Sequence, residues 1–82
     1  MKYAVVIEKG SESFGAYAPD LPGCAVVGES REEVVQLIQE AIELHLQSLK
    51  DHGDEIPPPV SSFEFVNVAG DSSFTARDLS LR

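Results

Sequence analysis

The sequence has few basic residues, one cysteine and no long apolar run, and each shortage excludes a class of protein. Its 6 lysines and arginines are scattered among 14 acidic residues, which gives a net charge of -8. Nucleic-acid binding depends on clustered positive side chains, whereas this chain repels phosphate overall. The single cysteine, Cys24, cannot form an internal disulfide, which fits a reducing compartment. The apolar run at residues 4–7 is too short for a signal peptide or a membrane span, so we expect a cytoplasmic protein without membrane contact.

The remaining composition is that of a small folded domain. Of the 82 residues, 43% are hydrophobic, which is enough to drive collapse, and the length corresponds to a single domain at 1–82. A domain of this size has a modest core and gains stability from association. An acidic surface attracts basic proteins and speeds their encounter, although it also serves solubility.

Three short strands are predicted in the first third of the chain. Residues 3–8 are β-branched and aromatic, and both faces of this strand are apolar, which is typical of a central strand. Residues 13–18 form the second arm of a hairpin, and residues 25–28 form a short third strand. The two prolines and the glycine of residues 19–24 exclude a paired strand there and predict a shaped connector.

A long helix follows at residues 31–52. Ser30 is a good N-cap, and Glu33 three residues later completes a capping box. Apolar residues recur at spacings of three and four, so one broad face is apolar. Gly53 is predicted to end the helix as its C′ residue.

The alternation of residues 63–68 predicts a fourth strand, and the tail at residues 74–82 follows as an arm. The predicted fold is therefore α+β with the order β-β-β-α-β. One helix covers only one face of such a sheet, and the other face needs cover from the tail, a partner or another copy. We therefore expect a homodimer or a higher oligomer.

No constellation of residues predicts catalysis, a cofactor or a bound metal. A thiol–imidazole pair would have to come from Cys24 with His45 or His52, and each of the three has a simpler structural role. Capping explains Glu33, and turn chemistry explains Asp20. The acidic candidates for a metal-dependent hydrolase are Glu8, Asp20, Glu33, Glu40 and Asp71.

One combination of motifs resembles the HicB-like antitoxin family of toxin–antitoxin systems. The resemblance covers residues 1–59 and includes the Gly-Glu-Ser-x-x-Glu segment that opens the helix, as well as the Glu40-Ala41 pair in its middle. The residues that carry the motif or its local structure are Pro19, Asp20, Leu21, Pro22, Gly23, Cys24, Ser30, Glu33 and Gly53.

The resemblance implies a partial ribonuclease-H-like sheet with one long helix, and a protein that is not an enzyme. It also implies a partner: a small basic toxin of the HicA type, which cleaves mRNA and which the antitoxin covers. Many family members carry a C-terminal DNA-binding segment. Residues 60–82 show a strand and an arm in its place, which argues against direct DNA binding by this chain.

Two alternatives to a toxin-binding protein remain open. One is a stand-alone module that associates with itself or binds a small ligand, and the other is an unrecognised hydrolase. For a binding protein, aromatic side chains are the expected interface anchors, although each also suits an ordinary core. These anchors are Tyr3, Phe14, Tyr17, Phe63, Phe65 and Phe74.

Overall fold

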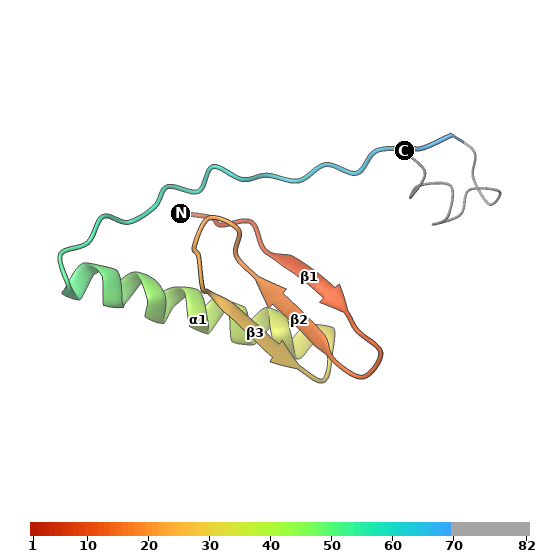
Figure 1. The fold of residues 1–82 in the computed structure, drawn as a ribbon, viewed down its shortest axis with the longest axis horizontal. Coiled ribbons are helices and arrows are strands. Elements are labelled where there is room, and N and C mark those ends of the chain that lie inside the picture. Colours follow the sequence, from red (N-terminus) through yellow and green to blue (C-terminus); the bar gives the residue numbers. More distant parts are fainter. Residues whose placement is uncertain (70–82) are drawn as a thin grey trace.

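The computed structural model describes residues 1–69, which form a sheet of three antiparallel strands and one long helix (Figure 1). Strands β1 (Val6–Lys9), β2 (Phe14–Tyr17) and β3 (Ala25–Gly28) precede helix α1 (Arg31–Asp51). The predicted α+β class and the order β-β-β-α are therefore confirmed.

The strand order in the sheet is β1-β2-β3, so β2 is central and β1 lies at an edge. The prediction that the first strand is central was wrong. Short connections pair strands that follow one another, and β2 is joined to both neighbours in this way. Two apolar faces indicate how much burial a strand requires, but they do not fix its place in the sheet.

The connector between β2 and β3 consists of two consecutive turns that share Leu21. The Leu21 N–H donates to the Ala18 carbonyl at 3.0 Å, and the Cys24 N–H donates to the Leu21 carbonyl at 3.0 Å. The second of these turns has Pro22 and Gly23 as its central residues, and Gly23 has a φ of 84°. These residues suit a type II turn, because its third residue has a positive φ, which glycine adopts freely, and proline is common at its second position. The Ala18 N–H closes the connector by donating to the Cys24 carbonyl at 3.1 Å.

The helix begins at the predicted residue and ends at Asp51, one residue before the predicted end. Ser30 Oγ accepts the Glu33 N–H at 3.1 Å, while Glu33 Oε1 accepts the N–H of Glu29 at 2.6 Å, one residue before the N-cap. At the other end, Gly53 has a φ of 72°. Its N–H donates to the Lys50 carbonyl, and the next N–H, that of Asp54, donates to Leu49 at 2.8 Å. This pair of bonds is a Schellman motif.

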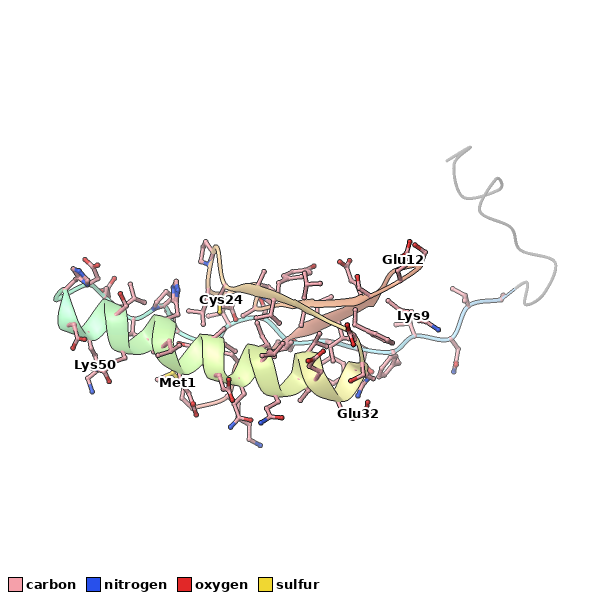
Figure 2. All side chains as sticks on the ribbon, turned by 90° about the horizontal axis from the view of Figure 1, so that it is seen from below. Met1, Lys9, Glu12, Cys24, Glu32 and Lys50 are labelled. Atoms are coloured by element: carbon pink, nitrogen blue, oxygen red, sulfur yellow. The ribbon has the colours of Figure 1, made fainter. Side chains whose placement is uncertain are left out.

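The core lies between the sheet and the helix, which form two layers (Figure 2). From the sheet side it contains Ala16, Ala18 and Cys24, and from the helix it contains Val34 and Ile38, all of them buried. The connector contributes one more side chain, because Leu21 is fully buried. The turn between β2 and β3 therefore belongs to the core.

The predicted fourth strand is absent from the described residues. Residues 63–68 are extended and exposed, and they pair with no strand. Figure 1 shows this segment passing the β1 side of the sheet and diverging from it. Alternation specifies a pleated segment, but a strand also needs an edge within hydrogen-bonding reach. The predicted arm at residues 74–82 lies outside the described residues.

Candidate partner-binding surface

The sheet face that points away from α1 is apolar, and within residues 1–69 no helix packs on it. Directly opposed residues share a face, and the pairing of β2 with its neighbours places Val6, Tyr17 and Ala25 in one row. Gly15 and Val27 belong to the next row of the same face. The side chain of Val27 is 71% exposed and that of Tyr17 is 39% exposed. We call these five residues the open sheet face.

The predicted aromatic anchors in the sheet divide between the two faces. Phe14 and Tyr3 are half-buried and pack against the core on the helix side. The Tyr3 hydroxyl also donates to the Pro57 carbonyl at 2.5 Å, which ties the start of the chain to the segment after the helix. Tyr17 alone of these three belongs to the open sheet face.

The anchors after the helix lie apart from the sheet. Phe63 and Phe65 are 77% and 88% exposed, and their ring centroids are 5.7 Å apart in an edge-to-face arrangement. Such a contact between residues two apart places both rings on one side of an extended chain. Phe74 lies outside the described residues.

Asp20 holds the segment that follows the helix. Its Oδ2 accepts the N–H groups of Val60 and Ser61 at 3.0 and 2.9 Å, and its Oδ1 accepts the Ser61 hydroxyl at 2.8 Å. The sequence predicted only a turn role for Asp20. Local sequence gives no signal for these bonds, because their partners lie 40 and 41 residues away.

These bonds predict a pH-dependent attachment of the segment. Hydrogen bonds from the Ser61 backbone and hydroxyl, and then from Val60, lower the pKa of Asp20 below its ordinary value, while desolvation opposes them. Because the folded-state pKa is depressed, the stabilising contribution is present above about pH 4 and is lost as the pH falls through the folded-state pKa. We expect the segment to detach at that point.

Backbone NMR of the Val60 and Ser61 amides measures this attachment. In the wild type, both resonances should titrate with a midpoint below about pH 4. In Asp20→Asn they should stay at one position across the range, whereas Asp54→Asn, in the same segment, should leave the wild-type titration unchanged. A wild-type midpoint above the ordinary carboxyl range would contradict the assignment.

The other residues considered for catalysis or metal binding make contacts that explain them structurally. Burial raises the pKa of the Cys24 thiol, which lowers its thiolate content and its reactivity. The Nδ1 of His52 lies 2.7 Å from the Ser48 carbonyl at the helix end. Glu33 accepts a backbone N–H, as described above. Within residues 1–69, no three His, Cys, Asp or Glu side chains gather as a metal site would require. Asp71 lies outside the described residues.

An apolar groove, which the sequence analysis missed, lies between the start of the chain and the helix. It has a volume of about 370 Å³. Val35, one of its lining residues, is 41% exposed although it belongs to the apolar stripe of the helix. The width of that stripe was the available signal, because a three-stranded sheet does not cover it. The groove is lined by Met1, Tyr3, Val5, Val35, Gln39, Ile42, Glu43 and Leu46.

The geometry is that of a small α+β domain with exposed apolar surfaces, a feature typical of proteins that bind other proteins. A sequence model described as the HicB_like antitoxin of bacterial toxin–antitoxin systems matches residues 3–74. The chain therefore belongs to the HicB-like antitoxin family, and this membership supports an antitoxin role and a regulatory protein with a toxin partner.

Individual relatives agree with this assignment. The chain is 40% identical over 58 residues to a UPF0150 protein of Thermoplasma acidophilum, covering 70% of this chain and 84% of the relative. It is 40% identical over 55 residues to a UPF0150 protein of Archaeoglobus fulgidus, covering 66% and 80% of the two chains. An uncharacterised 14.9 kDa protein of Haemophilus phage HP1 is 28% identical over 67 residues, covering 82% of this chain and 50% of the phage protein. No solved structure matches the chain.

No helix among residues 1–69 is long and apolar enough to cross a membrane.

Proposed function

We propose that this protein is an antitoxin that binds and neutralises a small basic, mRNA-cleaving toxin of the HicA type by protein–protein contact in the cytoplasm, with no catalysis of its own. The observation that carries the proposal is the open sheet face, where Tyr17 on the central strand and Val27 on edge strand β3 are exposed. Burying it against a partner removes apolar surface from water. The proposal takes residues 1–82 as one domain, with a core at residues 1–59.

Charge favours a basic partner for this surface. The net charge is -8, and Glu8 shares a face with Gly15 and Val27, as their pairing shows. Opposite charges steer two proteins together and select between partners, while the apolar centre supplies most of the affinity. The toxin active site, which must attract RNA phosphates, would supply the positive surface.

The first test captures the partner. With this protein as bait in its native cell extract, mass spectrometry should recover a small basic protein in near-stoichiometric amount. The recovered protein should cleave mRNA when purified alone, and an equimolar amount of this protein should stop the cleavage. Recovery of the bait alone, or of a protein without ribonuclease activity, would contradict the proposal.

The second test locates the contact. Val27→Glu should weaken binding of the toxin by about tenfold or more, because it replaces an apolar side chain that is 71% exposed on the open sheet face with a charge that the contact would bury. The matched control is Leu44→Glu, since Leu44 is 72% exposed but belongs to the helix layer. Calorimetry on the two variants distinguishes the open sheet face from other surfaces. Equal toxin affinities of the Val27→Glu and Leu44→Glu variants would show that the open sheet face does not contact the toxin.

We also propose that the protein is a homodimer or a higher oligomer. The apolar groove beside α1 and the exposed Phe63 and Phe65 support this, because a single chain leaves both without a partner among the described residues. The same features favour the alternative of a stand-alone, self-associating module without a toxin. The partner capture above separates the two functions.

A further inference from the structure

The groove between the start of the chain and α1 has the position of a missing fourth strand. Tyr3 and Val5 form its wall on the β1 side, and its floor is the helix stripe at Val35, Ile42 and Leu46. Strand β1 has β2 on one side only, so its outer backbone edge is free of strand partners among the described residues. A strand added at this edge would extend the sheet over the uncovered part of the helix.

Residues 63–68 have the properties that such a strand requires. The segment is extended, and the rings of Phe63 and Phe65 project from the same side. Glu64 and Val66 take the opposite side, as alternation demands. The segment is exposed along its length, and its preceding residues are fixed by the bonds from Asp20. It therefore projects from a defined point as an unpaired strand (Figure 1).

We infer that residues 63–68 of one copy pair with the free edge of β1 in a second copy, and that Phe63 and Phe65 enter the groove of that copy. The segment diverges from β1 of its own chain, so within one molecule the strand and the edge remain apart (Figure 1). Each chain offers one strand and one such edge. Reciprocal exchange uses both, and it closes a dimer with two-fold symmetry.

The charges of the two contacting segments are compatible with this dimer, and the phenylalanine rings supply a large share of the surface that it must bury. Lys2 precedes β1 and Lys9 is its last residue, and Glu64 is the only charged residue of the segment. The repulsion between two acidic chains is weakened by salt at physiological ionic strength. Four phenylalanine rings, two from each chain, bury roughly 600–1,000 Å². This is about half to four fifths of the roughly 1,200 Å² that the smallest stable interfaces require, so the paired backbones and their other side chains must bury the rest.

This inference deepens the self-association proposed above and does not depend on a toxin. The test uses the full chain and native mass spectrometry with light scattering. The wild type should be a dimer. Combining Phe63→Glu with Phe65→Glu should raise the dimer dissociation constant by about tenfold or more, and Val35→Glu should do the same from the groove side. Two controls should remain dimeric: Leu44→Glu on the exposed helix surface and Val66→Glu on the opposite side of the segment.

Mixing the two defective proteins distinguishes exchange from other forms of association. The variant with Phe63→Glu and Phe65→Glu retains an intact groove, and the Val35→Glu variant retains an intact segment at residues 63–68. The mixture should therefore form a heterodimer with one intact junction. Far-UV circular dichroism and melting curves establish that each variant is folded, which is expected because the replaced side chains are exposed.

A wild-type monomer, a dimer indifferent to both variants, or a mixture without heterodimer would each overturn the inference. A wild-type monomer whose melting temperature falls when Phe63 and Phe65 are both replaced by glutamate would also overturn it. Residues 63–68 would then pair with β1 of their own chain. Toxin capture and inhibition are measured separately. A strand-exchanged dimer that binds no toxin would uphold the inference and overturn the proposed function, and a monomer that inhibits a toxin would do the reverse.

Discussion

Replacing Leu21 with alanine should lower the free energy of unfolding by about 2–5 kcal/mol, the range for a large aliphatic side chain removed from a packed core. Leu21 is fully buried, although it lies in a connector between two strands. Both turns of the connector close on this residue, so the surrounding backbone cannot readily collapse into the cavity. A domain of this length has a total stability of about 4–12 kcal/mol, so the variant should lie near its unfolding threshold.

Urea denaturation followed by circular dichroism measures this effect. Leu44→Ala is the matched control, because the same side chain is 72% exposed on the helix and its loss should change stability by less than about 0.5 kcal/mol. If both variants unfold at the same urea concentration, Leu21 does not have the core role assigned to it.

Gly23→Val should destabilise the protein by about 1–2 kcal/mol for a backbone reason rather than a packing reason. A Cβ on Gly23 would meet no atom within 4 Å, so space is available for the side chain. The φ of 84° is the obstacle, because a β-branched residue strongly disfavours the left-handed region. The cost arises from the type II turn itself.

Asparagine at the same position distinguishes the effect of backbone conformation from the effect of side-chain size. Asn adopts positive φ more readily than other non-glycine residues, so Gly23→Asn should lose clearly less stability than Gly23→Val. Thermal denaturation of both variants gives the comparison. Equal losses would indicate that the size of the side chain matters and that the turn conformation does not.

The elements that the sequence predicted well are those specified by neighbouring residues. Ser30 and Glu33 define the start of the helix within one turn, and Gly53 defines its end through its own positive φ. The third strand has the predicted bounds, because the proline-rich connector and Gly28 delimit it. Alternation places Phe14, Ala16 and Ala18 on one side of the second hairpin arm, and all three lie in the core or pack against it.

The failures concern relations between distant segments. The two apolar faces of β1 indicated burial, but its position at the edge depends on the connection of β2 to both neighbours. The alternation at residues 63–68 predicted an extended chain, but whether a strand forms depends on a pairing edge, and the pattern contains no information about where one lies. The contact of Asp20 with Ser61 joins residues 41 apart and has no local signature.

The candidate surfaces were predictable only in part, because local patterns show which residues share a face but not what packs against that face. The need to cover the second sheet face followed from counting layers, and Tyr17, one of the expected anchors, lies on that face and is 39% exposed. Val27 and Val35 were not chosen, because valine at a strand or helix position usually belongs to the core. The anchor roles of the aromatic residues, and the ribonuclease-H-like likeness of the sheet, stay predictions.

The place of Met1 at the groove has a consequence for any chain joined ahead of it. Met1 lines the groove together with Tyr3 and Val5, and it is itself 83% exposed. Residues attached there, whether a fused domain or an affinity tag, would start at the rim of the groove and could occupy it as an internal competitor. A protein extended in this way should show a higher dimer dissociation constant than the unextended chain, although no residue of the interface has changed.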